Sequence, residues 1–339
     1  MAAESIRCAN ADCNFEADGR CVEGFALDEC PHVSALDIET IEEAGETDVR
    51  REEVKTLPLS LGEALARCDA STLQRQRSSC AIGIVAPNEA GKTSLIASVY
   101  DLLQGGAIDG IGFAGSSTLI GFEKVCHSAR TSSRRDMPHM ERTSAGADAT
   151  FFHLDLLSTQ GELVSLFIAD RSGEDYLAVA DDLGRSASLF ELRRADTLTM
   201  LVNGEHLVSS AYRHETKAIT SQIVGALVEA GAVRRGCRLA VVLTKQDVVL
   251  NSPNAGRVGA DFGEVVDGIV EDHGAYFGEI ERFVIAASPR NIADVQRGHG
   301  MDKLLHFWLC AGLSPLPATQ VRNSSTRLMD LLEIEEQNQ

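Results

Sequence analysis

A glycine-lysine-threonine turn between a predicted strand and a predicted helix constrains this chain more than any other feature. Residues 86–93 read APNEAGKT and follow the apolar run CAIGIV at residues 80–85. From residue 94 onward, apolar residues recur at helical spacing. The pattern G-x-x-x-x-G-K-[ST] in this setting is typical of a phosphate-binding loop, because main-chain N–H groups at a helix N-terminus attract anions. Ala86 replaces the first glycine, which requires a negative φ at that position.

The side chains of this loop have distinct expected roles. Lys92 is expected to reach the β- and γ-phosphates of a nucleotide, and the Thr93 hydroxyl is expected to bind Mg²⁺. The rest of the loop and the first helical turn are expected to hold the phosphates, mainly through main-chain N–H groups. These residues are Asn88, Glu89, Ala90, Gly91 and Ser94.

A second motif, DRSG at residues 170–173, follows the apolar run LVSLFIA at residues 163–169. An aspartate that ends a buried strand beside a phosphate-binding loop is where a Mg²⁺ carboxylate is expected, so Asp170 takes that role. The Gly173 N–H is expected to meet a γ-phosphate, and losing that contact would release residues 174–188 as a switch. Glu174 stands where a water-positioning residue is expected, so it is a catalytic candidate together with Lys92.

A third motif, TKQD at residues 244–247, follows the apolar run LAVVL. The carboxylate of Asp247 matches the two adjacent hydrogen-bond donors of guanine, which adenine lacks. Thr244 belongs to the same loop, and the stem of Lys245 is expected to lie over the base. A weaker element, VIAAS at residues 284–288, ends a predicted strand and supplies a main-chain N–H for the guanine O6. Its candidate residues are Ala286, Ala287 and Ser288.

The four elements resemble the G1, G3, G4 and G5 motifs of translation-factor-type (TRAFAC) GTPases. More narrowly, GEAL at residues 62–65, TLIGFE at 118–123 and TFFHLDL at 150–156 resemble the bacterial double-GTPase family of conflict and defence systems. The resemblance covers about residues 77–315. It implies an α/β fold, the three-layer α/β/α P-loop NTPase with a mostly parallel sheet. It also implies a Mg²⁺-dependent switch that binds GTP and GDP and hydrolyses GTP.

The long insert at residues 105–146 fits the same family and is expected to contain switch I within otherwise plain loop. By resemblance, Thr143 is the threonine that binds Mg²⁺ and assists catalysis; Thr118 and Thr131 are alternatives. Arg142 or Arg134 of the insert is a candidate for stabilising γ-phosphate charge.

Four of the nine cysteines lie in the first 36 residues. Four of five residues there are expected to bind a structural Zn²⁺, because a reducing cytoplasm favours metal over disulfide. The five are Cys8, Cys13, Cys21, Cys30 and His32. Their irregular spacing leaves free thiols as the alternative. The remaining cysteines are expected to be small buried side chains; they are Cys68, Cys80, Cys126, Cys237 and Cys310.

Four segments are expected: a Cys-rich leader (1–36), an acidic connector with a short helix (37–76), the GTPase domain (77–318) and a tail (319–339). Residues 58–69 are expected to be helical, and residues 71–79 are expected to be a polar linker.

The chain carries 50 acidic and 31 basic residues, a net charge of −19. This charge disfavours nucleic acid and anionic membranes as partners and leaves guanine nucleotide and an unknown protein. The sequence shows neither a signal peptide nor a span of about 18 apolar residues, so a cytoplasmic location is expected. Two other functions stay open: a nucleotide-binding scaffold with little hydrolysis, and an ATP-using enzyme.

Overall fold

The computed structural model describes residues 7–8, 33–34, 62–133, 146–158, 160–290 and 295–313. The chain divides into two compact units, Met1–Leu57 and Pro58–Gln339. In the first unit, β1 (Arg7–Cys8) pairs antiparallel with β2 (Val33–Ser34). Of the five candidate zinc ligands, Cys8 lies in β1. The other four and the predicted tail lie outside the described residues. Within the described ranges, no three His, Cys, Asp or Glu residues gather as metal ligands, and no helix is long and apolar enough to cross a bilayer.

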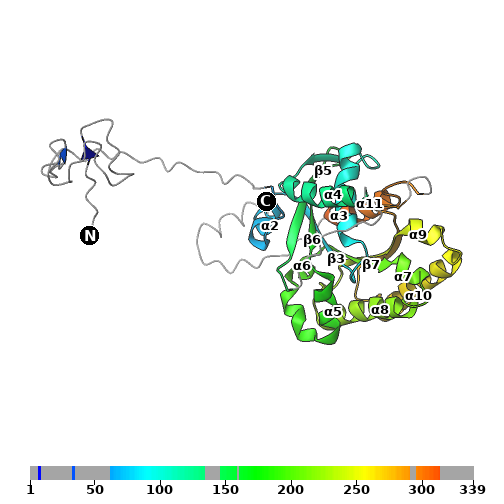
Figure 1. Ribbon diagram of the computed structural model, residues 1–339. Helices are drawn as coiled ribbons and strands as arrows, with labels where there is room; N and C mark the ends of the chain where they lie inside the picture. Colours follow the sequence, from blue (N-terminus) through cyan, green and yellow to red (C-terminus); the bar gives the residue numbers. More distant parts are fainter. Residues whose placement is uncertain are drawn as a thin grey trace, which may run out of the picture. The chain divides into compact units, whose positions relative to one another are not determined.

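The second unit is built around a seven-stranded sheet in the order β4–β5–β6–β3–β7–β8–β9 (Figure 1). From β6 to β9 all neighbours are parallel, whereas β4 and β5 run antiparallel at one edge. The strands are β3 (Ser79–Val85), β4 (Gly112–Gly115), β5 (Thr150–Leu157), β6 (Leu163–Asp170), β7 (Thr197–Asn203), β8 (Arg238–Thr244) and β9 (Glu279–Val284). The mostly parallel sheet is therefore confirmed.

Helices cover both faces of the sheet (Figure 1). One apolar core lies under α3, α4 and α11 and includes Leu95, Phe122 and Trp308. The other lies under α5, α8 and α10 and includes Leu227 and Phe262. These cores confirm the three-layer α/β/α architecture. The helices are α2 (Arg67–Gln74), α3 (Lys92–Gly105), α4 (Leu119–Ser133), α5 (Gly173–Asp181), η1 (Leu183–Ser188), α6 (Phe190–Arg193), α7 (Gly204–Val208), α8 (Arg213–Glu229), α9 (Gln246–Leu250), α10 (Ala255–His273) and α11 (Met301–Leu313).

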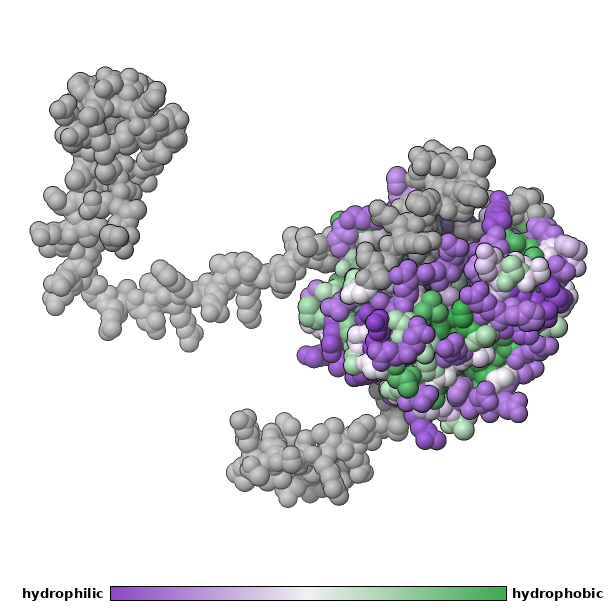
Figure 2. All heavy atoms as spheres, turned by 60° about the horizontal axis from the view of Figure 1, so that its bottom comes forward, coloured by the Kyte–Doolittle hydropathy of each residue, from purple (hydrophilic) through white to green (hydrophobic). Residues whose placement is uncertain are grey.

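On the face of α5 and α8 that Figure 2 brings forward, hydrophilic residues predominate around an apolar area. Among the described cysteines outside the leader, Cys80, Cys126 and Cys237 are buried, as expected. Cys68 is exposed on α2, so the expectation of burial was wrong for it.

The insert was expected to be mostly plain loop, and this expectation was wrong. It contains β4 at the sheet edge and the fifteen-residue helix α4. Phe122 and Cys126 of α4 are fully buried, and the Phe122 ring stacks on Tyr100 of α3 with centroids 4.7 Å apart. Phe122 and Cys126 stand four residues apart, and apolar residues at this helical spacing predict α4. Residues 134–145, which include Thr143, lie outside the described part of the chain.

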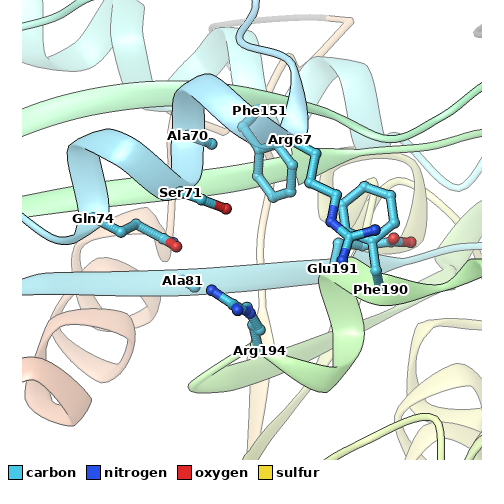
Figure 3. Close-up of a pocket in the computed structure, with 9 residues that line it drawn as sticks. All are labelled: Arg67, Ala70, Ser71, Gln74, Ala81, Phe151, Phe190, Glu191 and Arg194. Atoms are coloured by element: carbon cyan, nitrogen blue, oxygen red, sulfur yellow. The ribbon is translucent and has the colours of Figure 1, made fainter.

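The short helix of the connector was placed too early in the sequence. Instead of ending at residue 69, α2 spans Arg67–Gln74 and occupies the predicted linker. Just before it, Leu65 forms an antiparallel bridge with Phe151 of β5. The Arg67 guanidinium lies 4.4 Å from the centroid of the Phe190 ring, beside a cavity of about 30 Å³ that is too small for a nucleotide (Figure 3). The helix therefore depends on partners that are distant in sequence.

A buried histidine on β5 makes the stability of the fold pH-dependent. His153 accepts a hydrogen bond at Nδ1 from the Ser117 N–H at 3.0 Å, and its Nε2 lies 3.3 Å from Asp155 Oδ1. Burial lowers the pKa of His153 below 6.5, although Asp155 acts to raise it. Because the folded pKa is below the unfolded one, the stability that this lowered pKa provides is complete above about pH 6.5. It is lost as the pH falls through the folded pKa.

We therefore expect the free energy of unfolding to fall between pH 7 and pH 5 more steeply in the wild type than in His153→Gln. The difference in slope is at most about 1.4 kcal/mol per pH unit. Urea denaturation at several pH values measures it. His214→Gln, at an exposed position of α8, is the control and keeps the wild-type slope. Equal slopes for wild type and His153→Gln would contradict this account.

Candidate nucleotide-binding site

The three predicted motifs meet at one edge of the sheet. Each follows the carboxyl end of a central parallel strand: β3, β6 and β8 respectively. β3 lies between β6 and β7 in the sheet. The chain places β4 to β6 on one side of β3 and β7 to β9 on the other, so the strand order reverses at β3. In open α/β sheets, ligands bind in the crevice at such a reversal.

The loop between β3 and α3 has the backbone of an anion-binding nest. Gly91 has φ 92° and Glu89 has φ 63°, both in the left-handed region, which turns successive N–H groups toward one point. The Asn203 side chain at the end of β7 donates a hydrogen bond to the Glu89 carbonyl at 3.1 Å and holds this conformation. Ala86 is not among the described residues with positive φ, as its side chain requires. Sequence reasoning missed Asn203.

The first and second motifs are joined by a direct ion pair. Lys92 Nζ lies 2.9 Å from Asp170 Oδ1, and the two side chains are only 10% and 15% exposed. Thr93 is half-buried in the first turn of α3. The ammonium group of Lys92 and the oxygen atoms of Thr93 and Asp170 therefore belong to neighbouring residues beside the nest.

Gly173 allows the second motif to pack against the phosphate-binding loop. A Cβ at this position would lie 2.5 Å from the Ala86 carbonyl oxygen and 3.0 Å from Asn88 Oδ1, so a larger residue would displace the loop. The next residue, Glu174, accepts a hydrogen bond from Asn88 Nδ2 at 3.3 Å. The catalytic candidate Glu174 thus lies at the rim of the loop.

Arg171, inside the DRSG motif, is a buried anchor that sequence reasoning missed. Its side chain is 3% exposed and binds Glu191 of α6 through two hydrogen bonds of 2.7 and 3.2 Å. Burial disfavours the charge, but Glu191 outweighs this and raises the pKa of Arg171. Arg171 also donates to the Ala147 carbonyl, while Asp175 accepts from the Gly146 N–H at 2.9 Å. The end of the insert is thereby fastened to the start of α5.

The third motif presents a buried carboxylate. Asp247 is 5% exposed, and its Oδ2 accepts the main-chain N–H of Arg290 at 2.9 Å. Lys245 adopts a left-handed backbone with φ 55°. The loop packs so closely on Gly204 that a Cβ there would lie 2.3 Å from the Thr244 carbonyl oxygen. A carboxylate has further lone pairs, so Asp247 can still accept hydrogen bonds from a base.

The segment after β9 lies beside the third motif. Its Ala287 carbonyl accepts a hydrogen bond from Ser98 of α3 at 3.0 Å. The Ala286 N–H, however, donates to the His299 carbonyl at 3.1 Å. A donor for the guanine O6 is therefore expected from Ala287 or Ser288.

The candidates for the switch I threonine are only partly described. Thr118 is fully buried, and its hydroxyl donates to the His153 carbonyl at 3.2 Å and accepts the His153 N–H at 2.9 Å. These contacts engage Thr118 in the β5–α4 junction, which removes it as a metal candidate. Thr131 falls within α4, and Thr143 lies outside the described residues, as do Arg134 and Arg142.

A mostly parallel sheet with antiparallel strands at one edge, and with these loops at the carboxyl ends of its central strands, has the P-loop GTPase fold. The family comparison makes the class specific. Residues 80–309 match the model of the Double-GTPase 2 family, and the chain belongs to that family.

Solved GTPase structures are similar to this chain at low sequence identity. The signal recognition particle receptor SRb–GTP/SRX complex of Chaetomium thermophilum is 13% identical, with a TM-score of 0.39, over 69% of this chain and 97% of that one. The GTP-bound GTPase-like domain of S. cerevisiae Ski7 is 9% identical, with a TM-score of 0.42, over 74% of this chain and 53% of that one. The GDP complex of SAR1 from Encephalitozoon cuniculi is 11% identical, with a TM-score of 0.34, over 69% of this chain and 80% of that one. No curated protein matches the chain.

Proposed function

We propose that this protein binds guanine nucleotides with Mg²⁺ and hydrolyses GTP as a molecular switch. The observation that carries the proposal is the buried pair of Lys92 and Asp170, 2.9 Å apart beside a left-handed glycine loop. On the same edge of the sheet, the buried Asp247 supplies the acceptor that guanine requires.

The residues at the phosphate end fit Mg²⁺. Mg²⁺ prefers hard oxygen ligands, and the Thr93 hydroxyl and the Asp170 carboxylate supply them. Bound there, the ion would neutralise charge on the β- and γ-phosphate oxygens. Lys92 carries a positive charge into the same place, and the N–H groups of the nest add partial positive charges at short range. The net charge of −19 is therefore no obstacle to binding a triphosphate.

Hydrolysis requires a water that attacks the γ-phosphorus while the bond to the β-phosphate oxygen breaks. Glu174 is the proposed residue that orients this water or takes its proton, because it lies in the first turn of α5 at the rim of the loop. A carboxylate beside a phosphate adds negative charge to a transition state that is already negative, so intrinsic turnover is expected to be slow. Single-turnover hydrolysis of GTP tests this proposal: a rate above that of Lys92→Ala supports an enzyme.

The alternative is a nucleotide-binding scaffold with little hydrolysis. The hydrogen bond from Asn88 to Glu174 favours it, because this contact occupies the side chain that would serve the water. The same assay separates the two functions. GTP that binds but is cleaved no faster than by Lys92→Ala identifies a scaffold.

The switch itself is proposed to lie in the insert and in residues 170–188. Asp175 connects these two segments by accepting the Gly146 N–H, and Arg171 contacts the next residue, Ala147, so ordering one segment would affect the other. Such a change would alter a surface that a protein partner binds. Membership of the double-GTPase family supports a setting in bacterial conflict or defence. Co-purification with GTP-loaded and GDP-loaded protein tests for the partner, and equal capture in both states would contradict a switch.

We also propose that the leader binds one structural Zn²⁺. The cysteine content of residues 1–36 supports this site. Metal analysis of the purified full chain is expected to give one zinc per chain, and a Cys13→Ser, Cys21→Ser double variant is expected to lose it. Cys68→Ser, at an exposed position of α2, is the control and keeps the metal. Wild-type protein without stoichiometric zinc would remove this proposal.

A further inference from the structure

We infer that Glu205 is a specificity-determining residue of the guanine pocket, where it holds Lys245 and Arg290 in place around the base. The inference rests on the proposed function and deepens it. Neither the four nucleotide-binding motifs nor the phosphate-binding residues include Glu205. It lies in the first turn of α7, directly after the end of β7.

The Glu205 carboxylate bridges two loops that are far apart in sequence. Its Oε2 lies 2.7 Å from Lys245 Nζ in the TKQD loop, and its Oε1 lies 2.6 Å from Arg290 Nη2 in the segment after β9. Each oxygen serves one cation, so the carboxylate fixes the separation of the two side chains. The main chain at Glu205 is held by Asn203, whose Oδ1 accepts the Glu205 N–H at 3.1 Å.

Both cations that Glu205 holds belong to the environment of Asp247. The main-chain N–H of Arg290 donates to Asp247 Oδ2 at 2.9 Å, so the position of Arg290 affects the orientation of the carboxylate that reads the base. Lys245 precedes Asp247 by two residues and has a left-handed backbone that non-glycine residues seldom adopt. Lys245 and Arg290, which both lie next to the base site, are thus held by the same carboxylate, that of Glu205.

Glu205 is charged at neutral pH. Burial favours its neutral form, but hydrogen bonds and charges from Lys245 and Arg290 outweigh this and hold the pKa of Glu205 below its usual value. The bridge therefore consists of one negative and two positive groups. Removing its negative charge would leave two cations side by side without the group that separates them.

The competing interpretation is an ordinary surface ion pair. The side chain of Glu205 is 34% exposed, and pairs of such exposure contribute little to stability. The two interpretations differ in what a substitution changes. A surface pair affects thermal stability slightly and leaves base selection alone, whereas a positioning residue changes the preference for guanine over adenine.

The test uses the full chain and compares the affinities for GDP and ADP in Mg²⁺ buffer. Glu205→Gln preserves the shape of the side chain and removes its charge. It is expected to weaken GDP binding roughly two- to fivefold, with ADP binding unchanged, so that the preference for guanine falls by the same factor. Arg290→Ala is expected to have a similar effect. The double variant is expected to be little worse than either single variant, because both remove one bridge.

Glu215→Gln is the matched control, because Glu215 is exposed nearby in the chain on α8. It is expected to keep the wild-type affinities. A wild-type ratio of GDP to ADP affinity in Glu205→Gln would overturn the inference and leave the proposed function intact. A lower melting temperature with an unchanged ratio would likewise overturn it. No saturable GDP binding by the wild type would overturn the proposed function and this inference together.

Discussion

Lys92→Ala is expected to weaken GTP binding by roughly a hundredfold or more and to reduce single-turnover hydrolysis to the uncatalysed rate. Removing one partner of a desolvated charge pair costs about 2–5 kcal/mol, and each 1.4 kcal/mol is a tenfold change in affinity. The variant loses a phosphate contact and also leaves Asp170 without the ammonium 2.9 Å away. Titration with a fluorescent GTP analogue measures the affinity.

The matched control is Lys303→Ala, at an exposed position of α11. It removes the same charge from the chain, so any general electrostatic effect on an anionic ligand appears in both variants. If Lys92→Ala bound GTP as tightly as the control, the phosphate site would be elsewhere. Thermal denaturation without nucleotide distinguishes a lost contact from a lost fold.

Asp247→Asn is expected to exchange guanine for xanthine as the preferred base. The carboxylate accepts from the two donors of guanine, whereas an asparagine places an N–H₂ group against one of them. A buried donor left facing a donor costs about 1–3 kcal/mol, so GTP affinity is expected to fall by roughly ten- to a hundredfold. Xanthosine triphosphate, which has a carbonyl in place of the 2-amino group, is expected to bind better than in the wild type.

The amide oxygen that Asp247→Asn introduces can still accept the Arg290 N–H, so the loop is expected to remain in place. Competition titrations with GTP, ATP and xanthosine triphosphate measure the exchange. Asp267→Asn on the exposed side of α10 is the control and keeps the preference for GTP. An unchanged preference in Asp247→Asn would show that another group selects the base.

The central strands and the three motif loops could be predicted because their signals are local. An apolar run followed by a short polar motif defines β3 and its loop, and β6 and β8 repeat the pattern. The helix α4 could also have been predicted from Phe122 and Cys126, which stand at helical spacing. The family likeness of the insert indicates a switch and carries no information on this helix.

The supporting residues of the site could not be predicted, because their partners are distant in sequence. Arg171 is buried only because Glu191 follows 20 residues later, and an arginine in a loop is usually solvated. Glu205 meets Arg290 across 85 residues. The helix α2 has few apolar residues of its own and lies against Phe151 of β5. Such contacts appear only once the topology of the sheet is known.

Isothermal titration calorimetry of the full chain tests the central claim most directly. In Mg²⁺ buffer, GDP and GTP are each expected to bind saturably at one site per chain, with ATP much weaker. That result requires both the phosphate end at Lys92 and the base end at Asp247. Absence of heat with GDP and GTP, or binding of ATP as tight as that of GTP, would contradict the account.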